Sequence, residues 1–383
     1  MRITLSTFEY DRNLIGGAGI YALELSRWLA PLCQLTVRSC GAYQTPPLDA
    51  FAAAWFGAGV PNVDYLNLPR SLSGHGEAAF YYYALTQKPP DGCDAYVIND
   101  LSQGVAPFRD IPLVQILHHM PSLELKQVPF SRKRVAITLL AAFEKRALKR
   151  AHAVICQSKD TMAHALERYP EHAEKMSIIP NGVDVRIFTP ADTKAEATAG
   201  ETPIIACVAR GLERRKGIPK LLEALAAARR VTPVDLVIIG TGPQRVKQRM
   251  LAYAREQGII DAITLVDSVS LQELIALYQR AAVTVVPSLF EGFGRPALES
   301  MACGTPVVGT TVGALPELVD ESCGLLVAPG DVSALATALL DLLADERSMK
   351  RMGAAARQRA VALFSWDRVA QRVLNVCEEA ASA

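Results

Sequence analysis

The sequence has 383 residues, of which 50% are hydrophobic and 21% are charged. This is about twice the usual domain length, and the apolar content excludes a mostly disordered chain, so we expect two folded domains. The net charge of +1, from 40 basic and 39 acidic residues, argues against non-specific binding of nucleic acids and other polyanions.

The first half alternates short apolar runs with helical patterns. The runs are continuous rather than alternating, which is typical of buried parallel strands. We predict strands at 2–7, 34–38, 95–98, 112–117 and 153–157, and helices at 18–30 and 131–150.

A polar, proline-bracketed stretch then runs from Thr189 to Pro203 and has no apolar period. It predicts a linker over 191–202, which we expect to act as a hinge. Alternation restarts after it: we predict strands at 203–208, 234–239, 263–266, 283–286, 306–309 and 324–327, and helices at 217–230, 243–257, 271–280, 296–303, 331–343, 346–362 and 366–381.

This pattern predicts an α/β fold with two doubly wound, Rossmann-like domains, over 1–190 and 203–364. Ligands of such sheets bind at the carboxyl ends of the strands, so two facing sheets would form an interdomain cleft.

Eight cysteines form no CxxC pair, and no Cys and His pair has zinc-like spacing. Most lie in apolar runs, which favours small core residues in a reducing cytoplasm. The first residues do not resemble a signal peptide, and no apolar run approaches the roughly 20 residues of a membrane span.

The richest motif runs from Phe290 to Pro306 and follows the predicted strand 283–286. Pro296 suits the first position of a helix, so the preceding glycine loop would offer free backbone N–H groups at a helix N-terminus, where anions bind. Glu291 would lie on this loop and Glu299 in the first helical turn, where both carboxylates can accept bonds from hydroxyl groups. The alternative is a capped helix whose acidic residues favour its dipole.

Arg210 and Lys216 bracket a turn after the first strand of the second domain. Two cations beside a helix N-terminus suit a diphosphate, and the alternative is a solvated basic loop.

Two features of the first half face the same sheet edge. Gly17-Ala-Gly19-Ile-Tyr-Ala22 fits the dinucleotide fingerprint, but the second strand ends in Arg38-Ser39-Cys40, without the carboxylate that an NAD ribose needs. His118 and His119 follow the strand 112–117 and can bind a substrate hydroxyl or stay purely structural.

Several catalytic motifs are missing from the sequence. It has no P-loop, no HExxH, no DxD pair and no GxSxG elbow, so it shows no dedicated divalent-metal site and no phosphate loop of the P-loop type.

With these residues in hand, the chain resembles the retaining glycosyltransferases of the GT-B fold, the glycosyl transferases group 1, which carry an E-x7-E signature. The resemblance covers nearly the whole chain and is strongest from 203 to 330. Glu291 and Glu299 occupy the signature positions. One departure is Gly313-Ala314, where the family has two glycines, and another is the doubled histidine, which leaves open whether His118 or His119 is functional.

The resemblance implies a role for each matching residue. It places Glu291 on hydroxyls of the transferred sugar, Glu299 on the nucleotide ribose, and Arg210 and Lys216 on the diphosphate, with His118 near the reacting sugar. The implied catalytic residues are His118, Arg210, Lys216 and Glu291, and the implied donor-binding residues also include Gly16, Gly17, Val266, Asp267, Gly292, Phe293, Gly294, Arg295 and Glu299. The final helix, 365–383, is implied to pack back on the first domain.

The implied activity is metal-independent transfer, with retention, of a sugar from a UDP- or GDP-sugar. The acceptor is a saccharide, a lipid-linked or a small molecule, and no cofactor is needed. Two alternatives stay open: an NAD-dependent oxidoreductase, and a sugar-nucleotide-binding protein without catalysis.

Two segments each allow two interpretations, packing within the protein or binding of a partner. Residues 131–150 are rich in Lys and Arg beside Val135, Leu139, Leu140 and Phe143, which fits either an ordinary surface helix or peripheral contact with the anionic inner face of a membrane. The run Phe80–Tyr83 fits either packing or stacking on an acceptor sugar.

Overall fold

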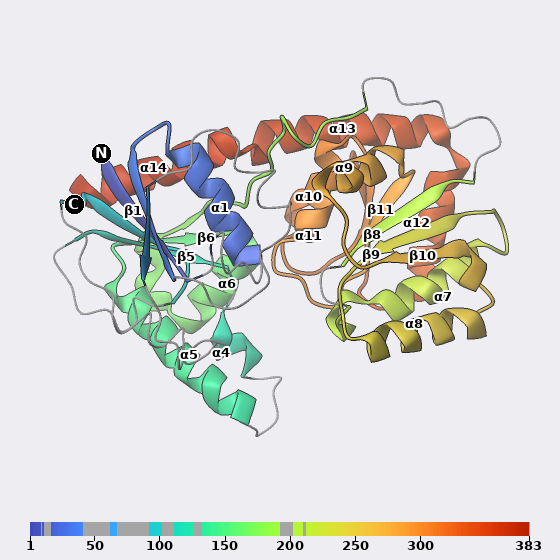
Figure 1. Ribbon diagram of the computed structural model, residues 1–383, viewed down its shortest axis with the longest axis horizontal. Coiled ribbons are helices and arrows are strands. Elements are labelled where there is room, and N and C mark those ends of the chain that lie inside the picture. The colour runs from blue at the N-terminus through green and yellow to red at the C-terminus, as the bar shows by residue number, and fades with distance from the viewer. Residues whose placement is uncertain are drawn as a thin grey trace. The chain divides into compact units, whose positions relative to one another are not determined.

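The computed structural model describes residues 1–8, 10, 17–40, 62–66, 92–101, 111–118, 120–125, 132–191, 202–209 and 212–382. The chain divides into two compact units, Met1–Gly182 with Trp366–Ala383, and Val183–Ser365 (Figure 1). Each unit is built on its own parallel sheet.

The first unit contains a seven-stranded sheet in the order β3-β2-β1-β4-β5-β6-β7. Its strands are β1 (Arg2–Thr7), β2 (Gln34–Cys40), β3 (Asn62–Leu66), β4 (Ala95–Ile98), β5 (Leu113–Leu117), β6 (Ala153–Cys156) and β7 (Met176–Ile178). The strand order reverses between β1 and β4, where doubly wound sheets bind their ligands. The five strands predicted for this half are confirmed, whereas β3 and β7 were missed.

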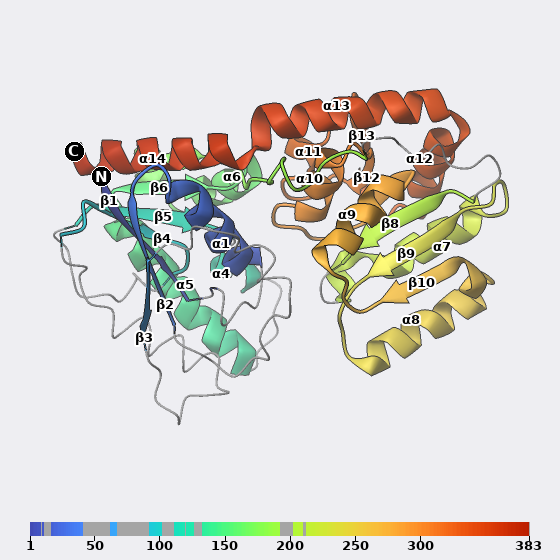
Figure 2. The same ribbon diagram turned by 45° about the horizontal axis from the view of Figure 1, so that its top comes forward.

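Helices of the first unit pack on this sheet. They are α1 (Gly17–Leu29), α4 (Pro121–Glu124), α5 (Arg132–Arg150), α6 (Lys159–Arg168) and α14 (Trp366–Ser382), with a 3₁₀ helix, η3, at Pro170–Lys175. The C-terminal helix α14 contacts α1 and the strands β4, β5 and β6 (Figure 2). Its buried residues recur at helical spacing, from Trp366 to Ala380, so one stripe of the helix faces the unit.

The second unit contains a six-stranded sheet in the order β10-β9-β8-β11-β12-β13. Its strands are β8 (Ile204–Val208), β9 (Asp235–Ile239), β10 (Ile263–Val266), β11 (Val283–Val286), β12 (Val307–Thr310) and β13 (Gly324–Val327). Its helices are α7 (Ile218–Ala228), α8 (Gln244–Glu256), α9 (Leu271–Arg280), α10 (Arg295–Ala302), α11 (Leu315–Leu318), α12 (Val332–Ala344) and α13 (Glu346–Phe364), with 3₁₀ helices η4 (Arg214–Lys216) and η5 (Ile260–Ala262). All six predicted strands are present.

The cysteines that the structure describes are free, and five are buried: Cys156, Cys207, Cys303, Cys323 and Cys377. Burial raises the pKa of the Cys207 thiol to about 12, so this thiol stays protonated at neutral pH. The prediction that cysteines serve as small core residues is confirmed for these five.

The boundary between the units lies earlier than residue 190, where the sequence placed it. The chain passes between the units at Gly182/Val183 and again at Ser365/Trp366. Residues 183–190 belong to the second unit because the Arg357 guanidinium donates to the carbonyls of Val185 and Phe188. The predicted linker, 191–202, lies almost wholly outside the described residues.

Candidate active site

The loop from Pro287 to Gly294 joins β11 to α10 at the carboxyl edge of the second sheet. Gly294 precedes the helix with a φ of 94°, in the left-handed region. Pro296 is the second residue of α10 rather than the first, and Glu299 therefore lies in its second turn, not in the first as predicted. The helix also starts one residue earlier than the sequence indicated, at Arg295.

Lys216 and Glu291 form an ion pair at this edge. The Lys216 Nζ lies 2.8 Å from Glu291 Oε2, and the Ser288 hydroxyl donates to the same oxygen at 2.9 Å. Only 12% of the lysine side chain and 10% of the glutamate side chain are exposed. The two groups that the resemblance placed on different parts of the donor thus neutralise each other here. Lysine has three donors and a carboxylate has two oxygens, so both groups keep capacity for a ligand.

The close approach of two loops produces this pair. Gly217, directly after η4, has a φ of 68°, and a Cβ there would lie 1.9 Å from the carbonyl oxygen of Pro287. A side chain at this position would separate the loop of Lys216 from the loop of Glu291. The contact is reinforced by the Leu289 N–H, which donates to the Arg215 carbonyl at 2.7 Å.

Glu299 is held from two sides. The Tyr278 hydroxyl donates to Glu299 Oε2 at 3.0 Å, and Arg295 Nη2 donates to Oε1 at 3.2 Å. Burial, with the neighbouring carboxylate as the second cause, raises the pKa of Tyr278 well above its ordinary value, so the phenol stays a donor. The other terminal nitrogen, Arg295 Nη1, is buried and has no hydrogen-bond partner in the part of the chain that the structure describes. The N–H groups of this nitrogen are donors that a ligand oxygen can accept.

The remaining residues of the predicted donor site are spread more widely. Phe293 is buried, and the Gly292 carbonyl accepts from the Ala314 N–H at 3.3 Å. Val266 ends β10 and Asp267 follows it, paired with Lys247 of α8. β10 is the edge strand of its sheet and is separated from β11, which precedes the Glu291 loop, by β9 and β8.

His118 follows β5 in the first unit and contacts Asn99 and Tyr21. Its Nε2 lies 2.6 Å from Asn99 Oδ1, and its ring packs edge-on against the Tyr21 ring with centroids 4.9 Å apart. Gly17 opens α1, and among the residues that the structure describes a Cβ there would meet nothing within 4 Å.

Several predicted residues lie outside the described residues. They are Gly16, His119, Arg210 and the run Phe80–Tyr83.

Sequence reasoning did not select Asn99, Ser288 or Tyr278. Ser288 lies three residues before Glu291, and Asn99 directly follows a buried strand, which are the signals that would have identified them. Tyr278 carried no such signal, because its link to Glu299 depends on how α9 and α10 pack.

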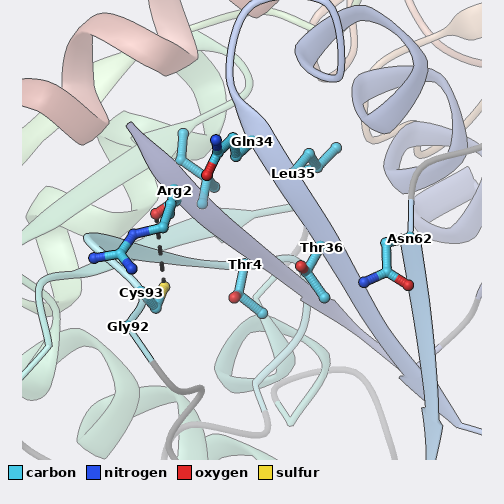
Figure 3. Close-up of a pocket in the computed structure, with 9 residues that line it drawn as sticks. Arg2, Thr4, Gln34, Leu35, Thr36, Asn62, Gly92 and Cys93 are labelled. Atoms are coloured by element: carbon cyan, nitrogen blue, oxygen red, sulfur yellow. Dashed lines mark hydrogen bonds between the residues drawn. The ribbon is translucent and has the colours of Figure 1, made fainter.

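A separate cavity of about 280 Å³ lies at the amino ends of strands in the first sheet (Figure 3). It is lined by Arg2, Ile3, Thr4, Gln34, Leu35, Thr36, Asn62, Gly92 and Cys93. Ligands of doubly wound sheets bind at the opposite, carboxyl edge, so this cavity is not part of the candidate site.

Comparison with known proteins gives two family matches that follow the two halves of the chain. Residues 189–359 match the model described as "Glycosyl transferases group 1", and residues 15–187 match "Glycosyltransferase Family 4". The fold and the site define a glycosyltransferase of the GT-B fold, and the chain belongs to the glycosyl transferases group 1 family.

Individual relatives agree with this family. The chain is 30% identical over 284 residues to a D-inositol 3-phosphate glycosyltransferase of Paenarthrobacter aurescens, covering 71% of this chain and 68% of the relative. It is 28% identical over 402 residues to the alpha-maltose-1-phosphate synthase of Mycolicibacterium smegmatis, with 98% of each chain covered.

A solved structure of similar fold is the sucrose-phosphate synthase of Thermosynechococcus elongatus. It has a TM-score of 0.77 and 26% identity, and the match covers 99% of this chain and 98% of that one. The prediction of a GT-B fold is confirmed.

Proposed function

We propose that this glycosyltransferase moves a sugar from a nucleoside diphosphate sugar to a hydroxyl acceptor with retention of configuration. The single observation that carries the proposal is the ion pair between Lys216 and Glu291. Glu291 lies on the loop that leads into the N-terminus of α10, eight residues before Glu299. This arrangement combines fixed positive groups with carboxylate acceptors at one sheet edge.

The positive groups suit the diphosphate leaving group. Breaking the bond between the anomeric carbon and the diphosphate places negative charge on the leaving oxygen, and groups oriented beforehand stabilise it most effectively. Lys216, the buried Nη1 of Arg295 and the eight-residue helix α10 supply such groups. We infer that Arg210, which the resemblance places on the same diphosphate, completes the set. Because the sequence has no DxD pair, we propose that no divalent metal takes part.

The carboxylates suit hydroxyl groups. We assign Glu291 to the transferred sugar, since it lies on the loop beside Lys216. We assign Glu299 to the nucleotide ribose, since Tyr278 and Arg295 hold it in one orientation. Gly292, Phe293 and Gly294 would offer backbone groups to the sugar, and Val266 and Asp267 would lie beside the base.

We assign the acceptor to the first unit. His118 is assigned to the reacting sugar, and Gly16 and Gly17 to the donor. The names of the relatives, which include a maltose-1-phosphate synthase and an inositol phosphate glycosyltransferase, support a saccharide or another small hydroxyl compound as acceptor. Membership of the family sets aside the alternative of an NAD-dependent oxidoreductase.

A binding panel tests the donor proposal. Thermal unfolding would be followed with UDP-, GDP- and ADP-sugars and with NAD⁺, for the wild type and for Glu299→Gln. A ligand at 100 times its Kd stabilises a protein by about 2.7 kcal/mol, so one nucleotide sugar should raise the Tm by several degrees in the wild type and less in the variant. Stabilisation by NAD⁺ alone would contradict the proposal. Binding of a nucleotide sugar without any release of nucleoside diphosphate would favour the catalytically inactive alternative.

We also propose that α5 touches an anionic membrane surface. Val135 and Leu139 are 55% and 48% exposed, so these two apolar side chains do not pack on the unit, although Ile137 and Leu148 do. The exposed face continues into the exposed side chains of Lys145, Arg146 and Lys149. Apolar and cationic groups on one helix face are what binding in the plane of an anionic bilayer requires. No helix among the described residues has the length and apolarity needed to cross a membrane.

Vesicle flotation tests this contact. The wild type should float with vesicles containing anionic lipid at low salt, and the variant Val135→Ser/Leu139→Ser should float less. Leu363→Ser on α13 is the matched control, because this leucine is as exposed as Leu139 and lies on the second unit. Absence of wild-type flotation would end the membrane proposal and would leave the donor proposal untouched.

A further inference from the structure

Asn99 is buried at the carboxyl edge of the first sheet, directly after β4. Its side chain is enclosed, with 2% of the residue exposed, and its backbone N–H donates to the Ser6 carbonyl at 2.9 Å. The residue therefore lies beside the point where the strand order reverses between β1 and β4. The resemblance assigned it no role.

The side-chain amide of Asn99 joins three elements. Its Nδ2 donates to the Ala18 carbonyl at 2.8 Å and to Thr7 Oγ1 at 3.1 Å, and its Oδ1 lies 2.6 Å from His118 Nε2. It thus connects the first turn of α1, the end of β1 and the residue that follows β5.

This network fixes the position of a proton on His118. A carbonyl oxygen can only accept, so the amide atom that faces Ala18 must be the nitrogen, and the oxygen must face His118. The histidine Nε2 must then carry the hydrogen, because two acceptors cannot bond to each other. In the neutral ring the lone pair is consequently on Nδ1.

Aromatic packing holds the ring in the same orientation. Tyr21 is fully buried, contacts the His118 ring edge-on, and packs in turn against Trp366 with centroids 5.2 Å apart. Trp366 is itself buried under Gly182, where a Cβ would lie 2.5 Å from the indole ring. Rotation of the imidazole would have to displace these large, enclosed side chains.

We propose that Asn99 is a positioning residue of the transferase: it holds His118 as the neutral tautomer protonated at Nε2 and ties that ring to the first turn of α1. Its catalytic consequence rests on the proposed function, because His118 is there assigned to the reacting sugar. The tautomer itself does not depend on that assignment. A catalytic histidine whose ring is held in one orientation beforehand needs no reorganisation during the reaction.

Nitrogen-15 NMR of histidine-labelled protein tests the structural part. The chain has 6 histidines, and the spectrum of His118→Gln assigns the signal that disappears. We expect the neutral His118 to be protonated at Nε2 in the wild type, and to lose this preference in Asn99→Leu. A wild-type His118 protonated at Nδ1 would overturn the proposal, whatever the activity of the protein.

Kinetics test the catalytic part, with nucleoside diphosphate release as the readout. Asn99→Leu should lower kcat by about 10²-fold, the size of effect expected from a misplaced catalytic group. In the His118→Gln background the same substitution should lower kcat no further. A second 10²-fold loss in that background would show that Asn99 does not act through His118.

A matched variant controls for loss of stability. Ser26→Ala removes two other buried hydrogen bonds of the first unit, neither of which involves His118: the one that Tyr10 Oη donates to Ser26 Oγ at 2.6 Å and the one that Ser26 Oγ donates to the Leu23 carbonyl at 2.7 Å. It should keep kcat and the histidine spectrum.

If His118→Gln proved fully active while the Nε2–H tautomer was observed, the assigned role of His118 would fail and the positioning by Asn99 would stand. If Asn99→Leu did not fold, the His118 tautomer of the wild type would still test the proposal. Asn99→Asp would then replace Asn99→Leu in the kinetics and should also lower kcat, because an aspartate cannot donate to the Ala18 carbonyl.

Discussion

Replacement of Lys216 by methionine should destabilise the second unit as well as slow the reaction. Methionine keeps most of the length of the lysine side chain but removes its charge. Glu291 Oε2 then keeps only its hydrogen bond from the neutral Ser288 hydroxyl among the two contacts described above. Breaking a fully buried ion pair costs about 3–5 kcal/mol, and a hydrogen bond to a charged group contributes about 1.5–3 kcal/mol. Since about a tenth of each side chain is exposed, we expect a loss near the lower figure, about 2 kcal/mol.

This free energy corresponds to a measurable change in melting temperature. For a domain of the size of the second unit, 1 kcal/mol shifts the Tm by about 2–4 °C, so Lys216→Met should melt about 4–8 °C lower. Glu291→Gln should lose a similar amount. The double variant should recover a large part of the loss, because neither charge is then left without its partner.

Activity should behave differently from stability. Loss of one oriented group that stabilises a developing negative charge costs about 10²–10³ in kcat, and the double variant should be no more active than Lys216→Met. Differential scanning calorimetry and nucleoside diphosphate release, measured on the four proteins, separate the two effects. The reasoning is refuted if the single variants melt like the wild type, or if the double variant regains its turnover.

The remaining predictions concern the donor site and its loops. Glu299→Gln should weaken nucleoside diphosphate binding in calorimetry by about 1.5–3 kcal/mol, whereas Glu291→Gln should mainly lower turnover; an equal loss of nucleotide affinity would disprove this division of roles. Gly217→Ala should destabilise the protein by more than the roughly 1–2 kcal/mol of a left-handed residue, because the methyl group meets the Pro287 carbonyl, and Gly258→Ala is the control, with a φ of 71° and open space around it. In urea unfolding, equal losses for the two alanines would contradict the proposed close approach. Treatment with EDTA should leave the wild-type rate unchanged, and a rate that collapses and returns with magnesium or manganese would contradict charge stabilisation by protein groups.

Local sequence patterns predicted several helices and strands of the second unit at their observed bounds. The bounds of α9 were predicted correctly because Ser270 and Glu273 form a capping box that fixes the start of the helix. The strands β10, β11 and β13 were also predicted at their observed bounds, since each is a short apolar run between turn residues.

The missed elements had weaker patterns. β3 contains Asn62 and Asp64 in five residues and lies at the edge of its sheet, and β7 has three residues. Both strands form because a neighbouring strand, β2 or β6, supplies hydrogen-bond partners for their backbone. The residues of the strand itself carry no sign of that neighbour. The helix α6 was missed although Ser158 caps it, because only Thr161 and Ala165 of its residues are buried and its apolar pattern is weak.

The candidate site was predicted as a list of residues but not as a set of contacts. Lys216 and Glu291 lie 75 residues apart and meet because β8 and β11 are neighbours in the sheet, which spacing along the chain does not reveal. The link from Asn99 to His118 likewise depends on β4 and β5 being adjacent. The early domain boundary depends on Arg357, which binds carbonyls about 170 residues away.

The central claim, transfer from a nucleoside diphosphate sugar with retention, is tested most directly by the anomeric configuration of the first product. The wild type would be incubated with UDP-glucose, GDP-mannose or ADP-glucose and with methanol as a simple acceptor, because a methyl glycoside does not change its configuration in water. Proton NMR would identify the glycoside, and release of nucleoside diphosphate would be followed in parallel. We expect one of these α-linked donors to yield the methyl α-glycoside in step with nucleoside diphosphate release. A methyl β-glycoside, or no release from any of the three donors, would contradict the claim.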